Sequence, residues 1–363
     1  MNLEDIARLA GVSRSTVSRV INDDPRVSKA VRARVKAIIA EHNYHPNAAA
    51  RSLASRRSRV IGLLIPVIAS KIFSDPWFPI MIQGCMDACQ DHDLGLMLLM
   101  ESETDPDAAR RLIERSLRGR HLDGVVVATS MIEGTSYDLL GDRDFPYVVI
   151  GRVPNGDATW VDIDNVDAAY QATIHLLSHG RRRAAMIAGP PSLVASLDRI
   201  EGFRRATEEA GIPATVHTAS FDQREAYETT LELLAGDDPP DAIFAGSDVM
   251  AVGILQAARR LRRDVPRDLG VMGFDDIQPD RVSPMGISNV HQPVRDLGRR
   301  AVELLNERIA NPVAPHRHDL LATRLVLRSS CGCSHTGNTT IPATPATTSD
   351  APPMDHDRHT GQG

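Results

Sequence analysis

Apolar residues in the first forty positions recur at helical spacing in three separate stretches. Gly11 separates the first stretch from the second and tolerates a positive φ, so it predicts a tight turn. Ser13 and Ser28 precede the second and third stretches, as helix N-caps do. The apolar faces are Leu3, Ile6, Ala7 and Ala10, then Val17, Val20 and Ile21, then Val31, Val35, Ile38 and Ile39. We expect three short helices that enclose one small core.

From residue 60 onward, short apolar runs alternate with helical stretches. This alternation is typical of parallel sheets covered by helices on both faces, so the predicted fold class is α/β. Such sheets bind ligands at the carboxyl ends of their strands. No glycine-rich dinucleotide or phosphate motif follows a strand. Strands are expected near residues 60–65, 95–100, 124–128, 147–150, 184–188, 242–245 and 270–274.

The second helix leaves a polar face exposed. Arg14, Ser15, Ser18, Arg19 and Asn22 point away from its apolar side. Arginine can pair with guanine, and serine or asparagine can reach other base edges, so this face suits a DNA major groove. The stretch alone is also consistent with an ordinary amphipathic helical hairpin.

Basic charge is concentrated at the N-terminus. Residues 1–60 hold 12 Lys or Arg and 5 Asp or Glu, a formal charge of +7, whereas the 363-residue chain has a net charge of −6. The remainder is acidic and would itself repel DNA. Phosphate attraction therefore belongs to the N-terminal segment.

Residues 46–57 are basic and rich in helix formers, but Leu53 is their one large apolar side chain. A helix this short is marginal in water, so we expect the segment to be disordered alone and to fold on DNA. A leucine inserted between base steps of the minor groove kinks a duplex. A plain basic linker is the alternative.

Length and composition indicate a large globular protein. The 363 residues predict two or three domains, with 42% apolar and 24% charged residues. No apolar run is long enough for a membrane span, and acidic residues follow Met1 closely, so we expect a cytoplasmic protein without a signal peptide. The four cysteines suggest neither a disulfide framework nor a zinc ribbon.

The run DIARLAGVSRSTVSRVIN, followed by NYHPNAAARSLAS, closely resembles the lactose-repressor (LacI/GalR) family of bacterial transcription regulators, and the resemblance extends to about residue 330. It implies that Arg14, Ser15 and Arg19 read bases and that Leu53 intercalates. The full set of DNA contacts that we expect is Leu3, Ser13, Arg14, Ser15, Thr16, Ser18, Arg19, Asn22, Ser28, Tyr44, Asn47, Ala50, Leu53 and Arg56.

The resemblance also implies the domain order. A helix-turn-helix headpiece (1–45) and a hinge helix (46–59) precede a core of two lobes built like periplasmic binding proteins (60–330). We expect an N-lobe of about 60–160 and 292–322, a C-lobe of about 161–290 and 323–330, and a disordered tail, 331–363. The chain then crosses between the lobes near 159–162, 289–293 and 322–325. A ligand would lie in the cleft between them, and its closure would act on the headpiece.

Several polar and aromatic side chains match ligand positions of this family. In the C-lobe these are Arg199, Phe221, Ser247 and Asp275, which together make a polar clamp with one flat wall suited to a pyranose ring. The N-lobe loop is longer than the family's usual one, and Asp75 replaces an Asn there. The further candidates are Asp75, Trp77, Phe78, Trp160 and Ile163. For Arg199 and Asp275, a structural salt bridge or a helix cap is the alternative.

The sequence predicts no cofactor and no metal site. His175 and His179 have the i, i+4 spacing that can hold zinc, but no Glu follows the first as in H-E-x-x-H and no third ligand is evident, so we expect a solvated helix face. Asp162, Asp164 and Asp167 lack the glycine and terminal glutamate of a calcium loop.

We therefore expect a homodimeric repressor that binds a palindromic operator and responds to a small molecule, most simply a sugar. A purine or sugar phosphate is an alternative effector. A constitutive DNA-binding protein with a vestigial cleft is a second alternative. An enzyme is the least favoured, because the sequence contains no nucleophile elbow, metal cluster or phosphate loop.

Overall fold

The computed structural model describes residues 2–21, 24–44, 57–101, 111, 114–116, 119, 121–129, 131, 140, 145–154, 158–277, 286–333 and 339–342. The chain divides into two compact units. The first contains Met1–Arg59 with Arg120–Asp123, and the second contains Val60–Gly119 with Gly124–Gly363. None of the helices described is long and apolar enough to cross a membrane.

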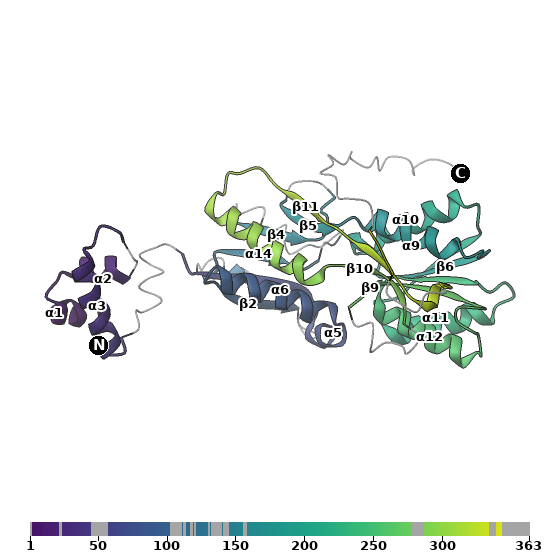
Figure 1. Cartoon of the computed structure of the whole chain (residues 1–363), viewed down its shortest axis with the longest axis horizontal. Helices are drawn as coiled ribbons and strands as arrows, with labels where there is room; N and C mark the ends of the chain where they lie inside the picture. The colour runs from purple at the N-terminus through teal and green to yellow at the C-terminus, as the bar shows by residue number, and fades with distance from the viewer. Residues whose placement is uncertain are drawn as a thin grey trace. The chain divides into compact units, whose positions relative to one another are not determined.

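The N-terminal unit contains the three predicted helices, α1 (Leu3–Ala10), α2 (Arg14–Ile21) and α3 (Lys29–Glu41) (Figure 1). Asn2 and Asp5 form a capping box at the start of α1, and Gly11 ends the helix at φ 61°. Ser28 caps α3 through the Val31 amide. The buried side chains are those that the periodicity predicted: Ile6, Ala7, Ala10, Val17, Val20 and Val35.

The second unit holds two sheets, and the first of them forms the N-lobe. It contains six parallel strands in the order β11-β5-β4-β3-β1-β2. Its strands are β1 (Val60–Ile68), β2 (Gly95–Glu101), β3 (Gly124–Val127), β4 (Tyr147–Ile150), β5 (Trp160–Ile163) and β11 (His318–Leu321). Helices α6 (Trp77–Asp91) and α14 (Val294–Ala310) pack on this sheet, and the short α5 (Ala69–Ser74) precedes α6.

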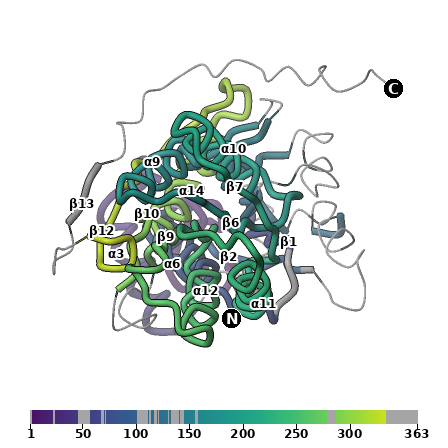
Figure 2. The backbone as a smooth tube through the Cα atoms, turned by 90° about the vertical axis from the view of Figure 1, so that its right-hand side faces the viewer, coloured from purple at the N-terminus to yellow at the C-terminus, as the bar shows by residue number. Residues whose placement is uncertain are grey.

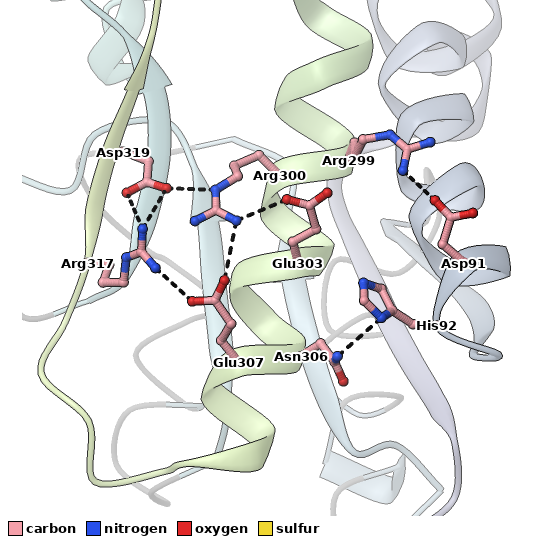
Figure 3. Close-up of polar contacts among 9 residues, drawn as sticks. All are labelled: Asp91, His92, Arg299, Arg300, Glu303, Asn306, Glu307, Arg317 and Asp319. Carbon is pink, nitrogen blue, oxygen red and sulfur yellow. Dashed lines mark hydrogen bonds and ion pairs between the residues drawn. The ribbon is translucent and has the colours of Figure 1, made fainter.

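Helix α14 returns to the N-lobe from a distant part of the sequence and is held there in two ways. A Cβ on Gly84 of α6 would lie 1.9 Å from the Arg295 backbone oxygen, so the two helices touch along their backbones. Figure 3 shows the polar side: Arg299 pairs with Asp91 at 2.5 Å, and Arg300 binds Asp319 of β11 at 2.7 Å. These contacts fix the start of α14, which follows a crossing between the lobes.

The C-lobe is a seven-stranded sheet in the order β13-β12-β10-β9-β8-β6-β7. Its strands are β6 (Ala184–Ala188), β7 (Ala214–Thr218), β8 (Ala242–Ala245), β9 (Gly270–Asp275), β10 (Ser288–His291), β12 (Arg324–Leu327) and β13 (Thr339–Pro342). Its helices are α9 (Asn165–Leu177), α10 (Val194–Glu209), α11 (Gln223–Ala235) and α12 (Asp248–Arg260). All ladders are parallel except β10 with β12 and β12 with β13.

Both faces of the C-lobe sheet are covered, α9 and α10 on one face and α11 and α12 on the other (Figure 2). Strand β6 shows why its sequence is a continuous apolar run. Ala184, Met186 and Ala188 pack toward α9 and α10, while Ala185 and Ile187 pack toward α11 and α12. The predicted α/β class is therefore confirmed.

Two expectations about the lobes need correction. Strand β5 belongs wholly to the first sheet, so the chain first changes lobe after Ile163 rather than near 159–162. The prediction of disorder from residue 331 is wrong for the part of the tail that is described. Cys331 is buried in a 3-10 turn, and Thr339–Pro342 pairs with β12 as an antiparallel strand.

Candidate nucleic-acid interface and small-molecule pocket

The exposed face of α2 carries the side chains that the sequence analysis proposed as base readers. Arg14, Ser15 and Arg19 are exposed, and Ser18 is half-buried. Arg14 Nη1 lies 3.2 Å from Glu4 Oε1, and both side chains are about two-thirds exposed. A pair this open is weak and can be exchanged for another partner. The face therefore presents guanidinium and hydroxyl donors whose side chains do not pack in the core.

The other predicted DNA contacts in the N-terminal unit have local structural roles. The Ser13 hydroxyl accepts a hydrogen bond from the Thr16 amide at 3.2 Å, and Ser28 caps α3. Leu3 and Tyr44 are half-buried against the small core. Asn22, Asn47, Ala50, Leu53 and Arg56 lie outside the described residues.

A cavity of about 290 Å³ lies between the two lobes of the second unit. Polar residues that follow six strands line it, because parallel strands of both sheets direct their carboxyl ends toward it. These residues are Thr129 after β3, Asn165 after β5, Ser220 after β7, Ser247 after β8, Asp275 at the end of β9 and Gln292 after β10. The cavity is thus placed where an open α/β sheet binds ligands.

Among the described residues that line the cavity, Arg199 of α10 is the one that carries a guanidinium, and it is buried. It donates from Nε to Asn165 Oδ1 at 2.9 Å, from Nη1 to the Gly246 carbonyl at 2.6 Å, and from Nη2 to Gln292 Oε1 at 3.3 Å. Its Cζ lies 3.6 Å from the centroid of the Phe274 ring. Burial lowers its pKa, and nearby carboxylates oppose that shift. The side chain is therefore rigidly oriented before any ligand arrives.

Asp275 faces the same cavity and is also buried. Its Oδ1 lies 4.0 Å from Arg199 Nη2, which is too long for a hydrogen bond, and it accepts none from the described residues. Burial raises the pKa of Asp275, and the neighbouring Arg199 opposes the rise. Thr129 Oγ1 is a second buried polar atom of this wall without a partner among the described residues. Both atoms are available to a polar ligand.

Aromatic side chains line the cavity from both lobes. Trp77 and Phe78 come from the start of α6, with ring centroids 5.2 Å apart and an interplanar angle of 83°. Phe221 comes from the C-lobe and has a φ of 48°, an uncommon value for a residue with a side chain. Gly189 makes room for its ring, since a Cβ there would lie 2.1 Å from Phe221 Cζ. Flat apolar walls therefore accompany the polar groups.

A family model described as "Bacterial regulatory proteins, lacI family" matches residues 2–47, and one described as "Periplasmic binding protein-like domain" matches residues 173–331. The chain is similar to the HTH-type transcriptional regulator CelR of Thermobifida fusca, with 35% identity over 334 residues that cover 90% of this chain and 97% of the relative. The chain belongs to the lacI family of bacterial regulatory proteins. The family resemblance inferred from the sequence is therefore confirmed.

Other members of the lacI family are nearly as similar. A ribose operon repressor of Halalkalibacterium halodurans is 34% identical and is covered over 96% of its length, with 90% of this chain matched. The HTH-type transcriptional repressor PurR of Haemophilus influenzae is 33% identical over 85% of this chain and 91% of its own. A solved structure titled as a CelR–cellobiose complex has a TM-score of 0.70 and 33% identity, covering 91% of this chain and 99% of that one.

Seven of the nine ligand residues predicted for this lacI-family chain line the cavity: Asp75, Trp77, Phe78, Arg199, Phe221, Ser247 and Asp275. Trp160 and Ile163 do not. The Trp160 ring stacks on His318 with centroids 4.8 Å apart, and Ile163 is part of the C-lobe core. Both residues lie on β5, which is hydrogen-bonded to β4 and β11. Their side chains pack against His318 and the C-lobe core instead of lining the cavity.

Sequence reasoning missed six polar residues of the cavity wall. Ser192 and Ser220 lie in C-lobe loops, and the other four are Thr129, Asp162, Asn165 and Gln292. Thr129 could have been found, because it follows a predicted strand. The other three lie beside β5 and β10, strands of four residues that the apolar pattern did not reveal. The expectation of a solvated face for His175 and His179 is also wrong, since both are half-buried.

Proposed function

We propose that this protein is a transcriptional repressor that binds a palindromic operator as a homodimer and is regulated by a small neutral sugar held in the interlobe cavity. The proposal rests on a single arrangement, a rigid guanidinium and a buried carboxylate that face each other between aromatic walls, with Oδ1 of the carboxylate accepting no hydrogen bond from the described residues. Vicinal hydroxyls of a sugar can donate to Asp275 and accept from Arg199, while the ring packs on Phe221 or Trp77.

The charge of the cavity favours a neutral ligand over a phosphorylated one. Three carboxylates, those of Asp75, Asp162 and Asp275, line it together with the single guanidinium of Arg199. Arg199 already gives three hydrogen bonds to protein acceptors. A phosphate would therefore meet more negative than positive charge. A volume of about 290 Å³ suits a small sugar rather than a long chain.

Operator recognition would use the exposed face of α2. One helix of this length reads only part of a site, so two copies are needed for a palindrome. Exposed apolar side chains in the N-lobe supply a surface for pairing: Met86 on α6 is 42% exposed, and Met97 and Leu98 on the edge strand β2 are 36% and 42% exposed. Their burial in a dimer would remove them from water.

The test is fluorescence anisotropy with a palindromic duplex taken from upstream of the gene for this protein, at fixed salt. Neutral sugars such as ribose and cellobiose, sugar phosphates and purines are added in turn. We expect one neutral sugar to change operator affinity at least severalfold. A response only to a purine or a sugar phosphate would contradict the effector assignment, and no specific binding of any palindrome would contradict the repressor.

A further inference from the structure

Four potential metal ligands converge in the C-lobe from two segments far apart in the sequence. His175 and His179 lie one turn apart at the carboxyl end of α9, and Cys331 and Cys333 follow β12. Their ligating atoms all lie within 4.8 Å of one another. The cluster lies near the first residues of β9 and β10, and thus at the opposite edge of the sheet from the carboxyl ends that line the cavity.

Five of the six distances between ligating atoms of this cluster are 3.3–3.7 Å, close to those of a tetrahedral zinc site. Cys331 Sγ is 3.3 Å from Cys333 Sγ and 3.5 Å from His175 Nε2. Cys333 Sγ is 3.4 Å from His175 Nε2 and 3.7 Å from His179 Nε2, and the two imidazole nitrogens are 3.4 Å apart. Zinc bonds of about 2.3 Å to sulfur and about 2.0–2.1 Å to nitrogen place tetrahedral ligands roughly 3.4–3.8 Å apart.

The turn that carries the cysteines is fixed by hydrogen bonds. Ser288 Oγ lies 3.1 Å from Cys331 Sγ and can donate to it, and Oγ accepts from the Arg328 amide at 2.8 Å. Ser330 Oγ accepts from the Ser288 amide and donates to the Val271 carbonyl, both at 2.8 Å. A hydroxyl beside a ligating thiolate is the kind of outer contact that orients metal ligands.

Gly332 lets the two cysteines face the same point. Its φ of 114° is a conformation that side chains rarely allow, and a Cβ there would lie 3.2 Å from the His179 ring. The backbone therefore bends sharply between Cys331 and Cys333 and passes close to the imidazole. A larger residue would push the thiol groups away from α9.

We propose that His175, His179, Cys331 and Cys333 bind one zinc ion that fastens the segment after β12 to helix α9. Four protein ligands complete a tetrahedron and leave no open position, so the role is structural rather than catalytic. Two thiolates and two neutral imidazoles balance the charge of the ion, which suits a half-buried place.

The experiment uses full-length protein made without an affinity tag and dialysed against a buffer containing a weak chelator. Elemental analysis should find one zinc per chain. His179→Gln should weaken zinc binding about 100-fold or more, measured by competition with a chromogenic chelator. Cobalt in place of zinc should give tetrahedral visible bands and thiolate charge transfer. Zinc added to the metal-free protein should raise its melting temperature by about 5 °C or more.

Controls separate this site from other sources of metal binding. His217→Gln changes a half-buried histidine of the same lobe, whose Nε2 lies 3.1 Å from Thr215 Oγ1, and should leave the zinc content at one ion. Replacing His356 and His359 together, both in the C-terminal tail, should do the same. Cys331→Ser with Cys333→Ser should abolish the charge-transfer band, and His179→Gln provides a test if that variant does not fold.

Two results would overturn the proposal. One is a zinc content that stays at one ion per chain in both the His179→Gln variant and the double cysteine variant. The other is a disulfide between Cys331 and Cys333 in protein purified without reductant, seen as two titratable thiols in place of four, with no zinc taken up after reduction.

Discussion

Arg152 and Asp198 form a two-point ion pair across the two lobes, with Nε 3.1 Å from Oδ2 and Nη2 2.5 Å from Oδ1. Arg152 follows β4 of the N-lobe, and Asp198 lies on α10 of the C-lobe, next to the Arg199 that lines the cavity. The Arg152 amide also donates to Asp162 at 2.7 Å. Arg152 thus connects Asp162, a carboxylate of the cavity wall, to α10, the helix that carries Arg199.

Asp198→Asn should weaken effector binding, because separation of the lobes breaks this pair and closure reforms it. The Arg152 side chain is 29% exposed, so solvent screens part of the interaction, and we expect a loss of about 1–2 kcal/mol, or roughly 5- to 30-fold in affinity. Calorimetric titration with the sugar identified by the operator assay measures it. Asp238→Asn removes an exposed partner of Arg183 and is the control. Equal affinities in the two variants would refute a role in closure.

Arg199→Lys keeps the positive charge but cannot span the acceptors of Asn165, Gly246 and Gln292. We expect effector affinity to fall about 100-fold, since the ammonium lacks the planar fork that aims at the ligand. Thermal unfolding of the same sample reports any loss of stability. Arg205→Lys is a matched control on the same helix, where the guanidinium lies over the Tyr170 ring. If Arg199→Lys bound the sugar normally, Arg199 would be a structural residue only.

Gly189→Ala should displace Phe221 and weaken effector binding without touching the ligand itself. The new Cβ would lie within 2.5 Å of three ring atoms, so the ring must move out of its place in the cavity wall. We expect a loss of about 1–3 kcal/mol in effector binding. Gly236→Ala, at φ −69° with only ordinary contacts, is the control. Binding unchanged by Gly189→Ala would show that the ring is not part of the site.

The elements best predicted from sequence are those with a strong local pattern. The three N-terminal helices follow from apolar spacing and from Ser and Gly at their ends, and β6, β8 and β9 follow from runs that are buried on both faces. Strand β10, Ser288–His291, was missed because three of its four residues are polar. Both Ser288 and Asn289 are buried. The Ser288 amide donates to Ser330 Oγ in the turn after β12, and Asn289 Nδ2 donates to the Ile287 carbonyl, which a hydrophobicity pattern cannot show.

Site residues that belong to a short sequence motif were predicted, whereas contacts between distant segments were not. Arg199 and Asp275 were found because each belongs to a motif that is short in sequence. Their geometry was not predicted, since the 4.0 Å gap between them depends on how two loops meet. The four proposed zinc ligands were missed for the same reason. The spacing of His175 and His179 indicates two of them, and the other two, Cys331 and Cys333, lie about 150 residues later in the sequence.

Asp162 should make part of the protein's stability rise as the pH falls. Burial raises its pKa to about 6 from 3.8, against the opposing effect of amide donors from Ile163 and Arg152. At pH values between 3.8 and about 6, the Asp162 carboxyl therefore keeps its proton in the folded state and loses it in the unfolded state. Its stabilising contribution is complete below about pH 3.8 and is lost as the pH rises through about 6.

Asp162→Asn should accordingly gain unfolding free energy relative to the parent as the pH rises from 4.5 to 7.5, by about 1–3 kcal/mol. Urea denaturation of both proteins at several pH values gives this difference. The exposed Asp238→Asn variant shows how much of the trend comes from removing a negative charge alone. A difference that is flat with pH would mean that Asp162 titrates alike in the folded and unfolded states.

Arg19→Ala should reduce operator affinity more than another loss of one positive charge in the same unit. Arg19 is exposed on the polar face of α2, whereas Arg8 on α1 is engaged with Asp5 at 2.7 Å. We expect Arg19→Ala to cost about 1–3 kcal/mol with the palindromic duplex, because a base contact is lost, and to lower binding of unrelated DNA much less. Arg8→Ala should leave the ratio of the affinities for the palindromic duplex and for unrelated DNA unchanged. Anisotropy titrations over a series of salt concentrations separate the two effects, since a lost phosphate contact reduces the salt dependence while a lost base contact reduces the ratio of specific to nonspecific affinity. If Arg19→Ala weakened both duplexes equally, α2 would contact only the DNA backbone at this residue, and base reading would have to come from Arg14 and Ser15.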